Sequence, residues 1–393
     1  MRNLTEREIS ELIQKVFAPS ADDRVLTILV DVPNESIPDA PRWKDRRSLA
    51  SQWKSLLEKV EGDLGLPKIN IVYFENTGSN NADLPKKFYE WSGSPQTAHF
   101  ELLESQGDVK TQQEIFSASD IVLAPTEFSA TAPLRILAKR YDFRAATMPG
   151  FSRKMIPALS VDYELVHERV MAIKTRLDEA LAIEMRFATT ETEYHLFVDV
   201  RYRTAHASSG LLRERGVAGN LPSGEAFIVP YEGEKSEPSK TEGSLPVQFG
   251  EEIVVYEIKD NRAFEVSSKG KKSESERQKL LDEPAYGNIA EIGFGVLQPF
   301  GIKPIGELLL DEKLGLHIAF GRSDHFGGAV GPEAFQNPKN VVHIDRIYIP
   351  EAQNEVRVEK VVFVYPGNRK ELVIRDSEYE IQLEKQQTQN IIS

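Results

Sequence analysis

Two segments of five residues share one unusual alternation and constrain this chain more than the rest of its sequence: EIGFG at residues 291–295 and HIAFG at residues 317–321. Successive side chains of a β-strand point to opposite faces. In a strand, Glu291 would share its face with two glycines, and His317 with one alanine and one glycine. The opposite face of each strand would be apolar. Small residues beside a Glu or a His leave room for something other than side chains.

A third segment, VVHIDRI at residues 341–347, places His343 and Asp345 on a common strand face. Two imidazoles and two carboxylates that converge from three strands suit one or two divalent cations. Burying four ionisable groups without a cation would be costly. We therefore favour a metal site over an ordinary set of core polar groups.

The segment GNLPSGE, residues 219–225, predicts a further ligand. Asn220, Pro222 and Gly224 favour a tight turn. This turn would end at Glu225, directly before the apolar run AFIVP. A carboxylate on a rigid turn beside a strand is well placed to bind a ligand.

The composition excludes several classes of function. The chain has 393 residues, which predicts roughly two to three domains, and a net charge of −13, which argues against nucleic-acid and anionic-membrane partners. The absence of cysteine excludes disulfides, thiolate zinc sites and cysteine nucleophiles. No window reaches the roughly 18 apolar residues of a membrane span. The first 18 residues fit an amphipathic helix and not a signal peptide, so we expect a cytoplasmic protein.

The order of patterns predicts two domains. In residues 1–182, strand-like runs alternate with helical patterns, which indicates an α/β domain with a layered, mostly parallel sheet. In residues 183–393 short strands dominate, which predicts a mainly β (α+β) domain that carries the metal site. Two charge-rich stretches, residues 232–250 and 267–278, are predicted to be exposed loops. The tail from Lys385 onward is polar and expected to fray.

Two other ionisable residues are assigned no chemistry. Asp31 ends a strand pattern where open α/β sheets often bind ligands. No glycine-rich nucleotide motif follows that strand, so a turn carboxylate is the preferred interpretation. His167 lies among the apolar positions of a helical pattern over residues 162–183 and is interpreted as a packed or surface residue.

The motifs GNLPSGEAFIVP, GNIAEIGFG, GLHIAFG and VHID, in this order, resemble those of the aminopeptidase T (leucyl aminopeptidase, AmpS/PepS-like) metallopeptidases. The resemblance covers roughly residues 195–378. It implies an N-terminal α/β domain, a mostly β C-terminal domain, a homodimer and a peptide or small-molecule substrate. It also implies that the family's metal ligands correspond to Glu225, Glu291, His317, His343 and Asp345.

One position departs from the family pattern. The resemblance calls for a tyrosine about seven residues after the histidine of the third motif, where this chain has Asp324 and His325. If that tyrosine positions substrate or stabilises charge, peptidase activity depends on a replacement. His325 is a candidate acid–base group or added ligand at this place, and a plain loop histidine is the alternative.

The leading hypothesis is a two-metal hydrolase that cleaves N-terminal residues from peptides. Glu225 or Glu291 would bridge two divalent ions, for which zinc, cobalt and manganese fit equally well. A metal-bound water would attack the scissile carbonyl, and a Glu or His would relay the proton. The alternative is a ring-cleaving dioxygenase of the dihydroxypyridine type, because such enzymes resemble the aminopeptidase T family in fold. There, His317, His343 and Asp345 would hold one ferrous ion. A third possibility is a non-catalytic metal-binding member.

Overall fold

The computed structural model describes residues 2–384, and the polar tail from Lys385 lies outside them. The chain forms two compact units, which are described separately. Unit 1 comprises residues 1–164 and 210–223, and unit 2 comprises residues 165–209 and 224–393. The division differs from the single boundary expected after residue 182. Residues 165–182 group with unit 2, whereas residues 210–223 return to unit 1, where they add a strand to its sheet.

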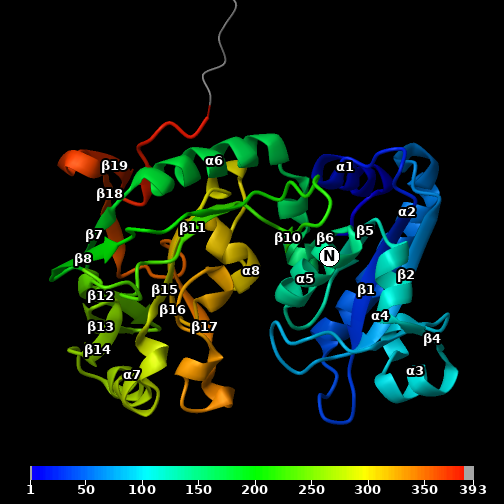
Figure 1. Ribbon diagram of the computed structural model, residues 1–393, viewed down its shortest axis with the longest axis horizontal. Coiled ribbons are helices and arrows are strands. Elements are labelled where there is room, and N and C mark those ends of the chain that lie inside the picture. Colours follow the sequence, from blue (N-terminus) through cyan, green and yellow to red (C-terminus); the bar gives the residue numbers. More distant parts are fainter. Residues whose placement is uncertain (1, 385–393) are drawn as a thin grey trace, which may run out of the picture. The chain divides into compact units, whose positions relative to one another are not determined.

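Unit 1 is built on a seven-stranded sheet in the order β10-β6-β5-β1-β2-β3-β4. The first five of these strands are parallel neighbours, and β3 and β4 are antiparallel. The prediction of a mostly parallel sheet layered with helices is therefore confirmed (Figure 1). The strands are β1 (Val25–Val32), β2 (Lys68–Glu75), β3 (Lys87–Glu90), β4 (Asp108–Thr111), β5 (Ile121–Ala124), β6 (Arg144–Thr147) and β10 (Ala218–Asn220).

The helices of unit 1 begin and end at residues that its sequence marks. Helix α1 starts at the capping box of Thr5 and Glu8 and buries the apolar face that the pattern predicted. Helix α2 has a proline in its first turn and ends at Gly65 in the left-handed conformation. The helices are α1 (Glu6–Phe17), α2 (Pro41–Leu64), α3 (Phe100–Gln106), α4 (Gln112–Ala118) and α5 (Thr131–Tyr141).

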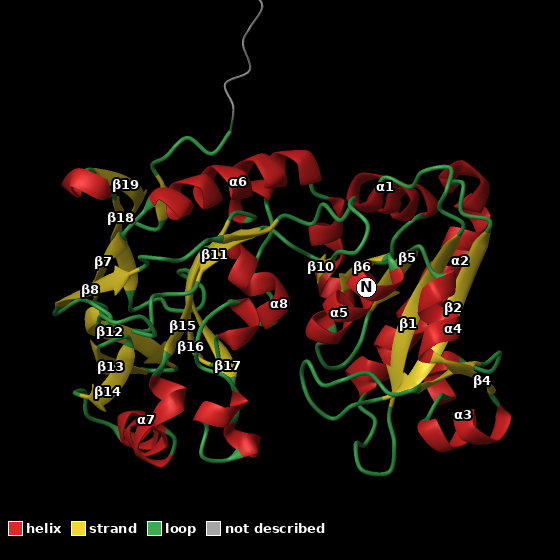
Figure 2. Cartoon of the chain, viewed as in Figure 1, coloured by secondary structure: helices red, strands yellow, loops and turns green. Residues whose placement is uncertain are grey.

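Unit 2 contains two antiparallel sheets, of eight and five strands, which are yellow in Figure 2. The larger has the order β14-β13-β12-β8-β7-β18-β19-β20, and the smaller has the order β17-β16-β15-β11-β9. The larger sheet comprises β7 (Ala182–Ala188), β8 (Glu193–Asp199), β12 (Glu242–Phe249), β13 (Glu252–Lys259), β14 (Arg262–Val266), β18 (Arg357–Val364), β19 (Lys370–Arg375) and β20 (Glu378–Tyr379). The smaller comprises β9 (His206–Ser208), β11 (Glu225–Ile228), β15 (Ile289–Gly295), β16 (Leu316–Gly321) and β17 (His343–Tyr348). The helices of unit 2 are α6 (Tyr163–Glu179), which begins at the boundary, α7 (Lys271–Asp282) and α8 (Leu308–Asp311).

The apolar face of the five-stranded sheet packs against the eight-stranded sheet. Phe294 contacts Phe363 with ring centroids 5.4 Å apart, and Phe320 contacts Tyr256 at 5.0 Å. Ile292, Phe294 and Ile318 are fully buried, and each contributes roughly 1.5–3 kcal/mol by leaving water. Because side chains alternate along a strand, this core holds the opposite face of β15 and β16 in a fixed position.

Two predictions about unit 2 were wrong. The stretches expected to be exposed loops contain strand β12 and helix α7. Helix α7 buries Ser273, Glu276 and Leu280, and Glu276 accepts hydrogen bonds from the hydroxyls of Tyr256 (2.8 Å) and Tyr286 (2.6 Å). These polar residues are buried because their partners lie elsewhere in the chain, which the composition of one stretch does not show.

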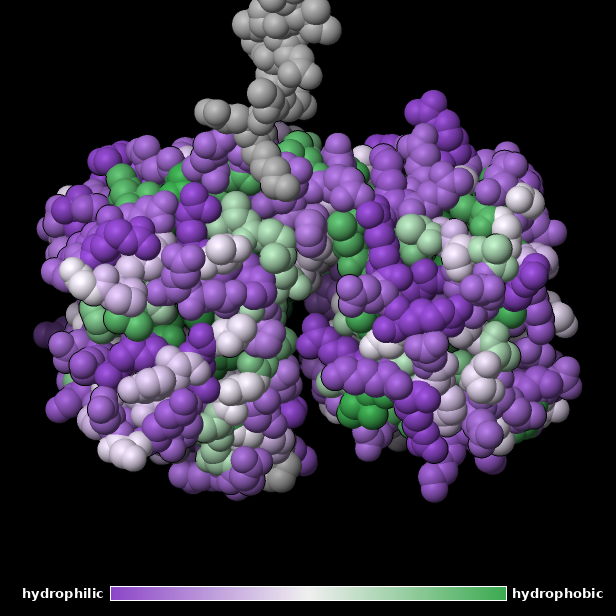
Figure 3. Space-filling model, turned by 45° about the horizontal axis from the view of Figure 1, so that its top comes forward, coloured by the Kyte–Doolittle hydropathy of each residue, from purple (hydrophilic) through white to green (hydrophobic). Residues whose placement is uncertain are grey.

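The surface agrees with the acidic, polar composition. In Figure 3 the visible face of each unit is mainly hydrophilic, with scattered hydrophobic patches. Within residues 2–384, no helix is both long enough and apolar enough to cross a bilayer.

Candidate metal centre

Each of the five candidate ligands lies opposite a glycine or an alanine of a neighbouring strand. The pairs are Glu225 with Gly295, Glu291 with Ala319, His317 with Gly293, Asp345 with Ala319 and His343 with Gly321. A Cβ atom at Gly293 would lie 1.9 Å from Nε2 of His317. The small residues therefore leave the space that the ligand side chains occupy on this face of the sheet, as the alternation predicted.

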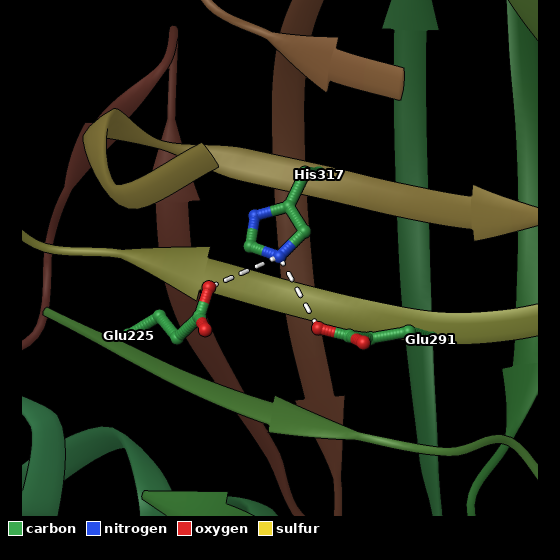
Figure 4. Close-up of side chains that lie close together, drawn as sticks. All are labelled: Glu225, Glu291 and His317. Carbon is green, nitrogen blue, oxygen red and sulfur yellow. Dashed lines mark hydrogen bonds and ion pairs between the residues drawn. The ribbon is translucent and has the colours of Figure 1, made fainter. Parts of the chain in front are cut away.

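The five side chains form two groups that share Glu291. In each group the ligand atoms lie within 4.8 Å of one another; the groups are Glu225, Glu291 and His317, and Glu291, His343 and Asp345. The two oxygens of Glu291 face different imidazoles. Oε1 lies 3.3 Å from Nε2 of His317, and Oε2 lies 3.4 Å from Nε2 of His343. Figure 4 shows the first group, in which the imidazole of His317 points toward both Glu225 and Glu291.

The spacing of these atoms fits a metal ion. Hydrogen bonds from N–H to oxygen are mostly about 2.9–3.0 Å long. Nε2 of His317 and Oε1 of Glu291 form a long hydrogen bond of 3.3 Å, and two ligand atoms on a tetrahedral ion, each bonded at about 2.0–2.1 Å, also lie about 3.3 Å apart. Oε2 of Glu225 lies 3.4 Å from Nε2 of His317, and this buried oxygen has no hydrogen-bond partner among the described residues. An oxygen of this kind is costly unless a cation or a donor satisfies it.

Backbone carbonyls orient both imidazoles toward the shared carboxylate. Nδ1 of His317 lies 3.3 Å from the carbonyl oxygen of Gly315, and Nδ1 of His343 lies 2.8 Å from that of Arg322. A carbonyl only accepts, so each Nδ1 carries the proton and donates it. Each Nε2 is then left to bind a metal, which is the usual arrangement of metal-ligating histidines.

The carboxylates make the site strongly negative. Burial alone would lower the pKa of His317, but contact with Glu291 and the charge of Glu225 raise this pKa to about 9. Burial opposes protonation of His343 as well, yet the charge of Asp345 and contact with Glu291 raise its pKa to about 10. Although burial would raise the pKa of Glu291, its contacts with both imidazoles lower it. The field that favours imidazolium at these positions also favours divalent cations.

The sequence did not indicate two charged residues beside this site, Glu312 and Lys313. The side chain of Lys313 is 0% exposed, and its Nζ donates a hydrogen bond of 2.6 Å to Oε1 of Glu225 and another to Glu312. Burial and the charge of Glu225, only partly offset by Lys313, raise the pKa of Glu312 to about 8. Adjacent acidic and basic residues are usually exposed to solvent. The only signal in the sequence is the position of these residues, because Glu312 lies five residues and Lys313 four residues before His317.

His325 lies beside the second group and belongs to neither group among the described residues. Its ring centroid is 5.3 Å from that of His343 and 4.0 Å from that of Phe326. Burial, together with the charges of His343 and Arg322, lowers its pKa to about 4. Its Nδ1 is buried without a hydrogen-bond partner in the described part of the chain. His325 is thus a neutral imidazole at the edge of the site.

The two residues to which no chemistry was assigned have structural partners. Asp31 is buried and accepts hydrogen bonds from the backbone N–H of Glu127 and from the side chains of Trp43 and Asn76. Nδ1 of His167 lies 3.0 Å from Oγ of Ser209. Asp31 therefore anchors the loop after β5.

No protein-family model and no curated protein sequence matches this chain. Several solved structures are similar to it, and two of them are enzymes of different kinds. For 2,5-dihydroxypyridine dioxygenase from Pseudomonas putida KT2440 the TM-score is 0.59, with 15% identity over 96% of this chain and 98% of that one. For wild-type AmpT from Thermus thermophilus the TM-score is 0.56, with 15% identity and the same coverage. The chain has the fold of both enzymes. At this identity the likeness shows the fold alone, so membership of the aminopeptidase T family stays a prediction.

Proposed function

We propose that this chain is a metal-dependent hydrolase that removes N-terminal residues from peptides, with two divalent ions bound on either side of Glu291. One observation carries the proposal: the two oxygens of Glu291 face two different imidazoles at 3.3 and 3.4 Å. A carboxylate with this geometry can bridge two ions, as two-metal aminopeptidases require. The fold shared with AmpT supports the same conclusion.

The residues divide into two sets of ligands. Glu225, His317 and one oxygen of Glu291 would hold the first ion, and His343, Asp345 and the other oxygen of Glu291 would hold the second. Zinc, cobalt and manganese all accept nitrogen and oxygen ligands of this kind. When bound, such ions lower the pKa of a coordinated water to about 7 and polarise a peptide carbonyl.

Substrate access and proton transfer would depend on side chains around the ligands. The side chain of His343 is 20% exposed, whereas that of His317 is 1% exposed, so substrate reaches the site from the His343 side. His325 lies on that side, and its Nδ1 has no hydrogen-bond partner within residues 2–384. We assign to His325 the relay of a proton: its neutral imidazole would accept the proton that the attacking water releases and pass it to the leaving amine.

The proposal is tested by metal content and by turnover. Protein purified without chelator is expected to contain two zinc, cobalt or manganese ions per chain and to release amino acids from amino-acid amides and short peptides. Glu225→Gln should abolish this release, whereas Glu265→Gln, a matched change at an exposed residue of the same unit, should not. Release that persists in Glu225→Gln, or a wild-type protein that holds metal without cleaving any peptide, would refute the proposal.

The second candidate is a mononuclear ferrous dioxygenase, which the fold shared with the Pseudomonas enzyme supports. It would use His317, His343 and Asp345 as its three ligands. Within the described residues, however, His317 falls in one group and the other two residues in the second group, which favours two positions over a single triad. One iron per chain, with oxygen uptake on a dihydroxypyridine that survives Glu225→Gln, would establish this candidate.

A further inference from the structure

Lys313 is a buried cation in direct contact with a candidate ligand. Its Nζ donates to Oε1 of Glu225 over 2.6 Å and also to the carboxylate of Glu312. Fully buried lysines are rare unless they are paired, since removing an ammonium group from water is expensive. Contact with two carboxylates offsets this cost, so all three side chains depend on one another.

The backbone places Lys313 at this position. Its 3₁₀ turn, Glu312–Leu314, lies against Gly295, the residue opposite Glu225. A Cβ atom at Gly295 would lie 2.2 Å from the carbonyl carbon of Lys313. In addition, the N–H of Leu297 donates to the carbonyl of Lys313 over 2.8 Å. The ammonium group is therefore held beside Glu225 by the sheet and is not a mobile surface charge.

This contact gives the two oxygens of Glu225 different roles. Oε1 is occupied by Lys313, whereas Oε2 has no hydrogen-bond partner among the described residues and lies 3.4 Å from Nε2 of His317. Glu225 can thus offer a metal one oxygen, and its negative charge is already shared with an ammonium group. In both groups the imidazole is paired with two carboxylates, His317 with Glu225 and Glu291, and His343 with Glu291 and Asp345. The first group differs because one of its carboxylates also pairs with Lys313.

We propose that Lys313 makes the two metal positions unequal, so that the Glu291–His343–Asp345 position fills first and the Glu225–Glu291–His317 position binds a weaker, exchangeable ion. The inference rests on the proposed two-metal function. Two effects act in the same direction. The ammonium group repels a cation that binds to the other oxygen of Glu225, and it prevents Glu225 from binding through both oxygens. Because the site is buried, solvent screens this repulsion poorly, and a difference of about tenfold or more in affinity is expected.

Calorimetric titration of the metal-stripped, full-length protein with Zn²⁺ tests the inference. The wild-type protein is expected to bind two ions in two resolved steps. Asp345→Asn should remove the tighter step and Glu225→Gln the weaker one. In Lys313→Met the weaker step should tighten by about tenfold, so that the two steps merge. Lys303→Met, which makes the same change at an exposed lysine of unit 2, should leave both steps as in wild type.

The substitution leaves two buried carboxylates without their ammonium partner, so circular dichroism must show that the variant folds. If Lys313→Met alone does not fold, Lys313→Met combined with Glu312→Gln, which also replaces the second acidic side chain that Lys313 contacts, is titrated in its place. The inference would be overturned if the two Zn²⁺-binding steps of the wild-type protein had equal affinities. It would also be overturned if the difference in affinity between the two steps were unchanged in Lys313→Met. If the wild-type protein cleaves peptides but binds its two Zn²⁺ ions with equal affinity, the proposed function remains intact. Two unequal steps without any cleavage would remove the proposed function and keep the role of Lys313.

Discussion

Gly293→Ala is the substitution that most directly tests the small-residue face. The added Cβ would lie 1.9 Å from Nε2 of His317 and 2.2 Å from its Cε1. The imidazole is fully buried and is held at its other nitrogen by the carbonyl of Gly315, so it cannot rotate into solvent. It must move by about 1 Å, a displacement that can cost about 100-fold in activity.

Metal affinity and peptide cleavage should both respond to this change. We expect the affinity of the first position for Zn²⁺ to fall by at least about tenfold and peptide cleavage to fall by about 100-fold. Overpacking should lower the free energy of unfolding by about 1–3 kcal/mol, so the variant should still fold. Calorimetric titration and a melting curve measure these effects.

Gly62→Ala provides the matched control. No atom lies within 4 Å of a Cβ built at Gly62, and this residue lies in helix α2, where alanine is favoured over glycine by about 1 kcal/mol. This variant should be slightly more stable and bind metal as the wild type does. Wild-type zinc affinity in Gly293→Ala would refute the reasoning, because the ring of His317 could not then stand where the structure places it.

Four further predictions follow from individual residues. His325→Ala should lower kcat by about 100-fold or more and leave the metal content at two ions per chain; a variant with wild-type kcat would remove His325 from the mechanism. Despite its burial, hydrogen bonds from Lys279 and Tyr286 lower the pKa of Glu276 from 4.5 to about 2, so its contribution to stability is full above pH 4.5 and is lost toward pH 2. The difference in melting temperature between wild type and Glu276→Gln should therefore shrink over that range, and a constant difference would contradict the assignment. Burial, only partly offset by the hydrogen bond from Glu127, raises the pKa of Asp31 from 3.8 to about 6, so Asp31 should make the protein less stable as pH rises from about 4 to 6; Asp31→Asn should remove this slope in pH-dependent unfolding. Finally, zinc at 100 times its Kd should stabilise the protein by about 2.7 kcal/mol, a gain that Glu291→Ala should abolish in a thermal-shift assay.

Much of the site could be predicted because its signals are local. Two-residue alternation placed Glu291 and His317 beside small residues of their own strands, and the strand register also sets Glu291 opposite Ala319 and His317 opposite Gly293. The turn before Glu225 could also be predicted from its Asn, Pro and Gly residues, and strand β11 begins at Glu225, one residue earlier than the apolar run predicted. These inferences need only the geometry of one strand or one turn.

What could not be predicted depends on contacts between distant residues. Lys313 lies in a run of charged residues, and only the approach of its turn to Gly295 buries it against Glu225. Residues 267–278 are charge-rich and so predict a loop, whereas the two tyrosine partners that bury Glu276 in helix α7 come from other elements. A local pattern shows which face of an element is apolar but does not show which buried charge will find a partner.

A crystal of the full-length protein soaked in zinc shows directly whether Glu291 lies between two metal ions. Anomalous scattering at the zinc edge locates each ion independently of any assumption about the ligands. Two peaks are expected, one on each side of the carboxylate of Glu291, with His317 beside the first and His343 beside the second. A single peak bound by both histidines together, or peaks that do not contact Glu291, would contradict this expectation.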